Sequence, residues 1–194
     1  MAALRLKLAA CTLTLGILTG CTPATPSTPP PEPSPTCTPE AGGPPSPCTQ
    51  YQYDQMIAKD KLYTEAEAVY RKFLAEDERI YRIGGVTEPT PVLLETTTGD
   101  YRKDSVEIYR DLYSRHSKAV GGQFRIAWIK REPGTSIGGS IVALRVCSDA
   151  SSVLIGPSKS ESKPGLIVEE TGYFVSDGAN LKLSAAQTKA VTKC

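Results

Sequence analysis

The chain has 194 residues, which is room for one folded domain and accessory segments. Its 22 basic and 21 acidic residues nearly cancel, and this balance argues against a nucleic-acid partner, which needs a concentrated basic face. Most of the 16 prolines lie between Pro23 and Pro47, and this is the first indication of a linker.

Residues 1–20 are typical of a secretory signal peptide. Arg5 and Lys7 give a cationic start, and an uncharged, largely apolar run follows from Leu8 to Leu18. That run is shorter than the roughly 20 residues of a membrane span. A signal anchor and a cytosolic protein with an apolar first helix are the competing interpretations, but charge, position and length favour a leader that is removed.

The next feature is the segment Leu18-Thr19-Gly20-Cys21, which resembles the lipobox of bacterial lipoproteins. The resemblance implies that the Cys21 sulfur receives a diacylglyceryl group and that a signal peptidase cuts before Cys21. Two acyl chains anchor a protein stably, since each buried CH2 contributes about 0.8 kcal/mol. The expected location is the extracytoplasmic face of the cell membrane, with the membrane as a partner through the lipid.

Residues 21–49 are expected to be the lipidated cysteine and a linker. Pro, Ser and Thr dominate residues 22–49, and no aliphatic side chain larger than Ala occurs there. Such a segment cannot bury a core, so the composition predicts an extended, polyproline-like spacer of about 3 Å per residue.

The cysteines support export. Without Cys11 in the leader and Cys21 at the anchor, four cysteines remain, an even number that suits disulfides outside the cytoplasm. Four cysteines allow three pairings, of which we favour Cys37–Cys48 in the linker and Cys147–Cys194 in the folded part. A zinc site would need other spacings and more than one histidine.

A helix is predicted from Tyr51 to Ile83, followed by Gly84-Gly85. Thr64 and Glu67 resemble a capping box, which leaves open whether residues 51–62 form a separate short helix. The apolar stripe of this helix consists of Leu62, Ala66, Val69, Tyr70, Phe73 and Ile80.

A second helix is predicted from about Tyr101 to Val120, where Gly121-Gly122 would stop it. Between the two helices, Pro89 and Pro91 allow a turn or a short helix over Pro91–Glu95.

After Gly122 the apolar pattern has a period of two, and Asp177-Gly178 is a hairpin signal. Helices followed by hairpin-linked strands predict an α+β fold, with the helices packed on one face of an antiparallel sheet. The predicted strands are Phe124–Trp128, Ile141–Cys147, Ile167–Val175 and Asn180–Ala186.

Residues 50–194 resemble the NTF2-like family, and in particular the NTF2-like lipoproteins of actinobacteria and their phages. The resemblance rests on the helix around Ala66–Arg71, the strand Leu144–Asp149 with its cysteine, the tyrosine strand Tyr173–Val175 and the C-terminal Cys194. The last strand departs from the family, because Leu181 or Leu183 stands where a Trp is common.

The family resemblance implies a curved sheet that forms a cone and can hold a small ligand. Tyr70, Tyr109, Trp128 and Tyr173 are candidates to line such a cavity, although ordinary core positions are the favoured interpretation for all four.

Catalytic motifs are scarce. Gly134–Gly138 fits G-x-S-x-G, but Pro133 precedes it and a strand follows, so a hairpin turn is the better interpretation than a nucleophile elbow. His116 lies near a helix end, where a cation suits the helix dipole. Glu169 and Glu170 point to opposite faces of a strand, and no metal or cofactor motif is visible.

The sequence therefore favours a membrane-anchored surface lipoprotein with a non-catalytic binding domain, no cofactor and an unknown ligand, cell-envelope component or protein partner. Two alternatives stay open. One is an enzyme of the isomerase or hydrolase type that uses the cone, and the other is a phage-encoded lipoprotein that excludes superinfection.

Overall fold

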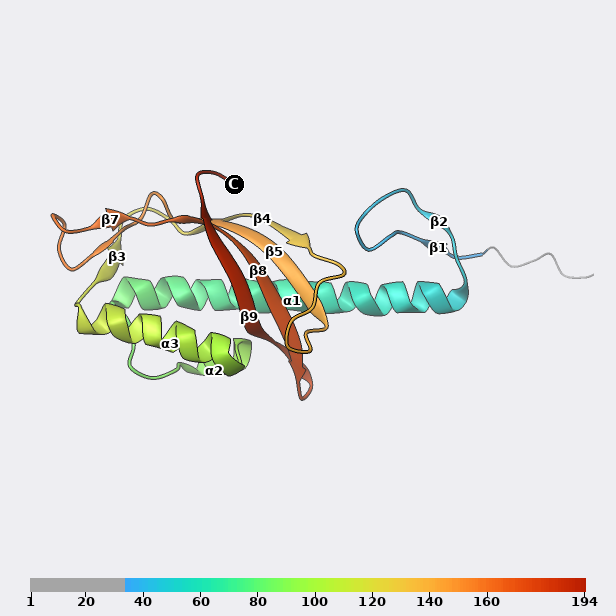
Figure 1. Cartoon of the computed structure of the whole chain (residues 1–194), viewed down its shortest axis with the longest axis horizontal. Coiled ribbons are helices and arrows are strands. Elements are labelled where there is room, and N and C mark those ends of the chain that lie inside the picture. The colour runs from blue at the N-terminus through green and yellow to red at the C-terminus, as the bar shows by residue number, and fades with distance from the viewer. Residues whose placement is uncertain (1–33) are drawn as a thin grey trace, which may run out of the picture. The chain divides into compact units, whose positions relative to one another are not determined.

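The computed structural model describes residues 34–194, and Figure 1 shows their helices and strands. The expected leader over residues 1–20 and the expected lipidation of Cys21 lie outside these residues, so both stay predictions. The described part is an α+β fold of helices and antiparallel sheets, as the order of elements predicted.

The first helix is one continuous element, α1 (Gln50–Ile83), and the capping box lies at a different place from the one predicted. The Thr49 hydroxyl accepts a hydrogen bond from the Gln52 amide, and the Gln52 side chain accepts one from the Thr49 amide. The capping box predicted at Thr64 was wrong. Thr64 lies inside α1, where its hydroxyl donates to the Asp60 carbonyl oxygen at 2.9 Å, a bond that threonine readily makes within a helix.

The end of α1 follows the prediction from Gly84-Gly85. Gly84 has a φ of 88°, and its amide bonds to the carbonyls of the last turn. The backbone at Gly85 lies very close to the helix α3 (Gly99–Ser114). Any larger residue would clash there, because a Cβ at position 85 would lie 2.2 Å from the Tyr109 carbonyl oxygen.

Two further helices follow, α2 (Pro91–Thr96) and α3 (Gly99–Ser114). The predicted end of the second long helix at Val120 was wrong. The chain leaves the helix at His116, which has a φ of 53°, and then forms the strand β3 (Lys118–Val120).

The main sheet is antiparallel in the order β4-β5-β8-β9, and its four strands lie where the period-two pattern predicted them. Their bounds are β4 Arg125–Arg131, β5 Val142–Asp149, β8 Ile167–Asp177 and β9 Asn180–Val191. A second sheet was not predicted, because two- and three-residue strands show no periodicity. It consists of β3, β6 (Leu154–Gly156) and β7 (Lys163–Pro164).

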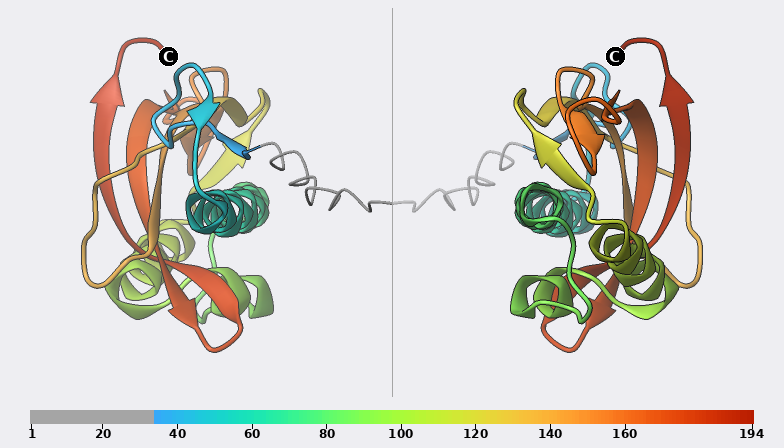
Figure 2. Two further views of the ribbon diagram at one scale, coloured as in Figure 1. Left: turned by 90° about the vertical axis from the view of Figure 1, so that its right-hand side faces the viewer. Right: turned by 90° about the vertical axis from the view of Figure 1, so that its left-hand side faces the viewer.

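The helices lie on one face of the curved main sheet (Figures 1 and 2). We call this the inner face, and it carries buried apolar side chains such as Leu144, Val146 and Phe174. The opposite, outer face carries Cys147, which forms a disulfide with Cys194. The inner face and the helices together build the hydrophobic core.

The segment before α1 differs from the expected spacer. A short hairpin of β1 (Thr36–Cys37) and β2 (Ser46–Pro47) is closed by the Cys37–Cys48 disulfide. Residues 34–49 belong to the same compact unit as the domain, since Glu40 accepts a hydrogen bond from the Tyr63 hydroxyl of α1. The composition missed this because the disulfide and a few side-chain contacts replace an apolar core.

Candidate functional site

A cavity of about 480 Å³ lies between α1, α3 and the inner face of the sheet. Its volume falls in the range usual for small-molecule sites. A second hollow of about 300 Å³ adjoins it and shares Leu74, Asp77 and Tyr81 with it. The main cavity is lined by Tyr70, Phe73, Leu74, Asp77, Tyr81, Asp100, Tyr101, Asp104, Ser105, Ile108, Tyr109, Ser148, Val168, Glu170, Ser184, Ala185, Ala186 and Thr188.

Asp77 is the central carboxylate of this cavity. It comes from α1, and the Tyr109 hydroxyl of α3 donates to its Oδ1 at 2.6 Å. Protein atoms surround the carboxyl, and the accessible surface that remains faces the cavity. This burial raises the pKa of Asp77 to about 7, with the negative charge of Glu170 acting in the same direction and the hydrogen bond from Tyr109 acting against it.

Glu170 is the second carboxylate and comes from β8. It lies opposite Val146 of β5 and Thr188 of β9, on the inner face. The Thr188 hydroxyl donates to Oε2 at 3.1 Å, whereas Oε1 is buried without a hydrogen-bond partner among the described residues. Burial raises the pKa of this carboxyl above its ordinary value.

Tyrosines surround both carboxylates. Burial raises the pKa of Tyr81 to about 12 and raises those of Tyr70, Tyr101 and Tyr109 well above the ordinary value of tyrosine. The hydroxyls therefore stay protonated at neutral pH and serve as hydrogen-bond donors. Edge contacts fix the rings, with centroids 6.2 Å apart for Tyr81 and Tyr109, and 5.4 Å apart for Phe73 and Tyr101.

No basic side chain belongs to the lining of the main cavity within residues 34–194. In the adjoining hollow, Arg125 is paired with Asp149 at 2.6 Å. The two buried carboxylates thus face hydrogen-bond donors and aromatic rings, but no compensating positive charge. The arrangement can bind a polar group of a ligand, and Asp77 is able to exchange a proton near neutral pH.

Two of the four predicted cavity residues are in the cavity, namely Tyr70 and Tyr109. The prediction for Trp128 was wrong. Strict alternation would place Trp128 on the same face as Ile126, but a bulge in β4 shifts the register between them. Trp128 therefore lies on the outer face opposite Cys147, and its indole N–H donates to the Cys194 carbonyl oxygen at 3.3 Å.

The prediction for Tyr173 was also wrong. Tyr173 neighbours Phe174, whose ring belongs to the core, and successive side chains of a strand point to opposite faces. Its hydroxyl donates to the Gln187 side chain at 3.1 Å on the outer face.

The residues of the cavity that were not predicted include both carboxylates, Asp77 and Glu170, and the tyrosines Tyr81 and Tyr101. A sequence signal existed for Asp77, which follows Tyr70 by seven residues and Phe73 by four, so it continues the apolar stripe of the helix. A lone acid in such a stripe is unusual, because burying its charge is costly. Glu170 is likewise an acid among apolar residues of a predicted strand, but this pattern is a weaker signal.

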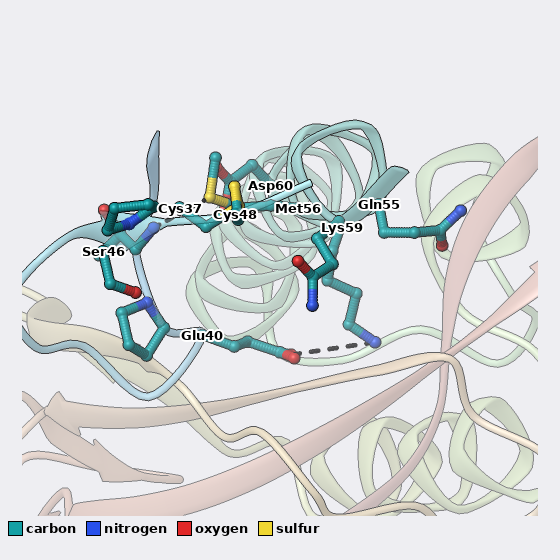
Figure 3. Close-up of a pocket in the computed structure, with 12 residues that line it drawn as sticks. Cys37, Glu40, Ser46, Cys48, Gln55, Met56, Lys59 and Asp60 are labelled. Atoms are coloured by element: carbon teal, nitrogen blue, oxygen red, sulfur yellow. Dashed lines mark hydrogen bonds and ion pairs between the residues drawn. A yellow bond between two sulfur atoms is a disulfide. The ribbon is translucent and has the colours of Figure 1, made fainter. Parts of the chain in front are cut away.

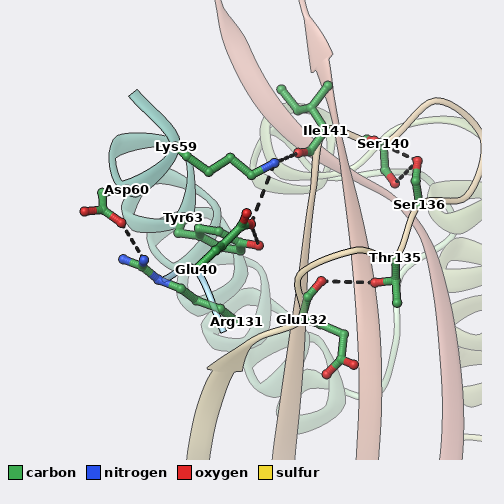
Figure 4. Close-up of polar contacts among 10 residues, drawn as sticks. All are labelled: Glu40, Lys59, Asp60, Tyr63, Arg131, Glu132, Thr135, Ser136, Ser140 and Ile141. Carbon is green, nitrogen blue, oxygen red and sulfur yellow. Dashed lines mark hydrogen bonds and ion pairs between the residues drawn. The ribbon is translucent and has the colours of Figure 1, made fainter. Parts of the chain in front are cut away.

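The G-x-S-x-G segment is an irregular loop between β4 and β5 (Figure 4). The Ser136 hydroxyl donates to the Ser140 carbonyl oxygen at 2.9 Å, and no helix follows the serine. A nucleophile elbow requires a strand before the serine and a helix after it, so the loop geometry agrees with the turn interpretation.

A third hollow, of about 510 Å³, lies between the β1–β2 hairpin and α1 (Figure 3). Its charged groups have partners: Glu40 lies 3.9 Å from the Lys59 Nζ and accepts from Tyr63, while Asp60 accepts from Arg131 (Figure 4). Because these contacts hold the hairpin on the domain, we treat this hollow as structural.

Comparisons of the chain with protein-family models, with curated proteins and with solved structures give no match. Within residues 34–194, the helices lack an apolar stretch of the length that crossing a bilayer requires. The same residues contain no group of three or more His, Cys, Asp or Glu side chains arranged to hold a metal ion. The function is therefore argued from the cavity itself.

Proposed function

We propose that this protein is a lipid-anchored lipoprotein on the extracytoplasmic face of the cell membrane, whose domain binds a small ligand without turning it over. The observation that carries the binding function is the cavity around Asp77 and Glu170. It combines apolar and aromatic walls with a few convergent polar groups of perturbed pKa, the combination typical of ligand sites.

The anchoring part of the proposal rests on the lipobox-like Leu18-Thr19-Gly20-Cys21. The two disulfides among the described residues support export, because disulfides persist mainly outside the cytoplasm. We further propose that the domain is an NTF2-like cone. A long helix on the concave face of a curved antiparallel sheet, with a cavity between them, supports this assignment.

Ligand binding is tested by screening a small-molecule library for compounds that raise the melting temperature of the purified domain. The variant Ala186→Phe places a large side chain on the inner face, opposite Gly172, where Ala186 lines the cavity. We expect hits that stabilise the wild type and fail with this variant. Ala190→Phe, at an exposed position of the same strand, is the matched control and should keep the response. A library without hits, or hits that still stabilise Ala186→Phe, would contradict the binding function.

Anchoring is tested by intact-mass spectrometry of the full chain extracted from membranes. We expect a mature chain that starts at Cys21, with the added mass of acyl chains and two disulfides. The variant Cys21→Ala should remain unprocessed and unlipidated. A wild-type mass that retains Met1 to Gly20 would overturn the anchor.

A second candidate function is acid–base catalysis in the same cavity, of the isomerase or hydrolase type. The observation in its favour is Asp77, whose pKa of about 7 suits a general base that acts near neutral pH. Incubation of the screening hits with the domain, followed by mass spectrometry, decides between the two functions. A product formed by the wild type and lost in Asp77→Asn would replace the binding proposal.

A further inference from the structure

We infer that the ligand is a small organic cation, with one ammonium group on an apolar body, bound between Asp77 and Glu170. This inference rests on the proposed binding function and specifies its ligand class. It follows from the charge balance of the cavity, from the contrast with paired acids elsewhere, and from the aromatic walls.

The charge balance is one-sided. Asp77 and Glu170 lie inside, Asp100 and Asp104 lie at the more exposed side on α3, and the lining contains no Lys, Arg or His among the described residues. Two carboxylates that share a site with little water favour a positive guest strongly, because the effective dielectric constant there is low. An anionic ligand would be repelled by every charged group of the lining.

The sequence neighbours of Asp77 and Glu170 have cationic partners. Glu76, the residue before Asp77, is buried but forms an ion pair with Arg79 at 2.7 Å. That hydrogen-bonded pair lowers the pKa of Glu76, whereas the pKa of Asp77 is raised. Glu169, the residue before Glu170, lies 3.4 Å from the Lys189 ammonium. Asp77 and Glu170 thus differ from their sequence neighbours, because neither forms an ion pair with a Lys, Arg or His side chain among the described residues.

An unsatisfied acceptor gives a second, independent indication. Oε1 of Glu170 is buried without a hydrogen bond of normal geometry among the described residues, whereas Oε2 accepts from Thr188; the nearby Tyr70 hydroxyl lowers the pKa of this carboxyl but less than burial raises it. A buried acceptor without a donor destabilises the folded state, and more so when it is charged. An ammonium group supplies both the missing donor and the missing charge.

The walls suit an organic cation better than a metal ion or a bare proton. Phe73 and the four tyrosines offer aromatic rings around the carboxylates. A cation over the face of an aromatic ring is attracted by the ring, and more strongly when the cation is desolvated. The volume of about 480 Å³ also exceeds what a hydrated inorganic ion fills, which leaves room for an apolar body.

Binding of a cation should be coupled to proton release from Asp77. The titratable groups around this carboxyl are tyrosine hydroxyls and other carboxylates. They are Tyr70, Tyr81 and Glu78 from α1, Tyr101, Asp104 and Tyr109 from α3, and Glu170 from β8. Arg125 and Asp149 in the adjoining hollow compensate each other. Because the cation prefers the ionised carboxyl, its affinity should fall as the pH drops below about 7.

Calorimetric titration of the disulfide-bonded domain at pH 7.5 tests the inference with three probes on one phenyl body: phenethylammonium, phenethyl alcohol and phenylpropanoate. We expect the cation to bind at least about tenfold more tightly than the alcohol, and the anion not to bind. At pH 6, a comparison of phosphate and MES buffers, which differ in ionisation enthalpy, should reveal proton release for the cation alone. Equal affinity for cation and alcohol, preference for the anion, or no binding of the cation would overturn the inference.

Substitutions locate the site. Asp77→Asn and Glu170→Gln keep the side-chain shapes, and each should weaken binding of phenethylammonium about tenfold or more, with little effect on the alcohol. Glu107→Gln makes the same chemical change at an exposed position of α3 outside the cavity lining and should cost about twofold at most, because that charge is screened by solvent. Unchanged affinity in both cavity variants would overturn the inference. Failure of the proposed binding function is distinguishable from failure of this inference. The binding function fails when the compound library contains no compound whose stabilising effect is lost in Ala186→Phe.

Discussion

Glu169 and Glu170 are neighbours in the sequence, yet the structure treats them in opposite ways. Glu169 lies on the outer face with the Lys189 ammonium at 3.4 Å and an Arg145 guanidinium nitrogen at 3.8 Å. Glu170 lies on the inner face, without a cation, and its pKa is raised by burial. The strand β8 thus carries two adjacent glutamates, of which Glu169 stabilises the folded state and Glu170 opposes folding.

The same contrast extends to the two faces as a whole. The outer face carries the Cys147–Cys194 disulfide, paired charges, and Trp128 with the Lys130 ammonium 4.7 Å from its ring. These contacts stabilise the sheet. The inner face has a well-packed core at one end and the cavity with its unpaired carboxylates at the other. Because unpaired buried charges oppose folding, their presence is better explained by ligand binding than by stability.

The largest expected effect tests the structural role of the outer face. Replacing both cysteines in Cys147→Ala/Cys194→Ala opens a link between residues 47 positions apart, and should lower the free energy of unfolding by about 4 kcal/mol. Urea unfolding measures this loss. Ligand affinity of the folded fraction should stay unchanged, and a selective loss of binding would contradict the division between the faces. Cys37→Ala/Cys48→Ala opens a shorter loop of 11 positions and should cost less.

The next largest effect is expected on the inner face, where replacing Asp77 should raise the free energy of unfolding rather than lower it. The folded Asp77 carboxyl has a pKa of about 7, whereas an unfolded aspartate titrates near 4. Between these values the folded state holds a proton that the unfolded state has lost, so stability falls as the pH rises. Asp77→Asn removes this dependence, and its gain over the wild type should grow by about 2–3 kcal/mol between pH 5 and pH 8. A gain that is equal at both pH values in urea unfolding would show that Asp77 titrates normally.

The adjacent glutamates provide a sharper form of the comparison. Glu170→Gln removes a buried charge and should stabilise the folded domain at pH 8 by about 1–2 kcal/mol. Glu169→Gln makes the same change on the outer face, where it breaks contacts with Lys189 and Arg145, and should destabilise the domain by about 1 kcal/mol or less. Changes of the same sign in the two variants would refute the contrast.

The smallest expected effect is the change in ligand affinity caused by a substitution on the outer face. Trp128→Ala removes the largest aromatic side chain of that face, but Trp128 has no part in the cavity. We expect a change of less than about twofold in the affinity of phenethylammonium, since distant sites act independently. Tyr109→Phe, which removes the hydrogen bond to Asp77, is the positive control and should change the affinity measurably.

Much of the fold was predictable from local patterns. The apolar stripe gave the long helix α1, the period-two runs gave the four strands of the main sheet, and Asp177-Gly178 gave the hairpin between β8 and β9. The failures have local physical causes. A threonine can bond backward inside a helix as well as cap it, so Thr64 was taken as a helix start.

The candidate site was predictable only in part. Tyr70 and Tyr109 were identified as aromatic residues on helix stripes, and both line the cavity. Trp128 was misplaced because a bulge in β4 reverses which face it points to, and a bulge leaves no mark in an apolar pattern. Asp77 and Glu170 come from elements far apart in the sequence, so their shared cavity depends on tertiary packing.

The β1–β2 hairpin has a consequence for where the protein can find its ligand. Because the β1–β2 hairpin begins at Thr36, ahead of α1, only the segment from Cys21 to Thr36 separates the hairpin from the proposed anchor in the sequence. At about 3.4 Å per residue its contour length is about 50 Å, roughly half of what a spacer up to residue 49 would allow. If Cys21 carries the anchor, the cavity samples only a thin layer above the bilayer, and its guest is a compound that accumulates there.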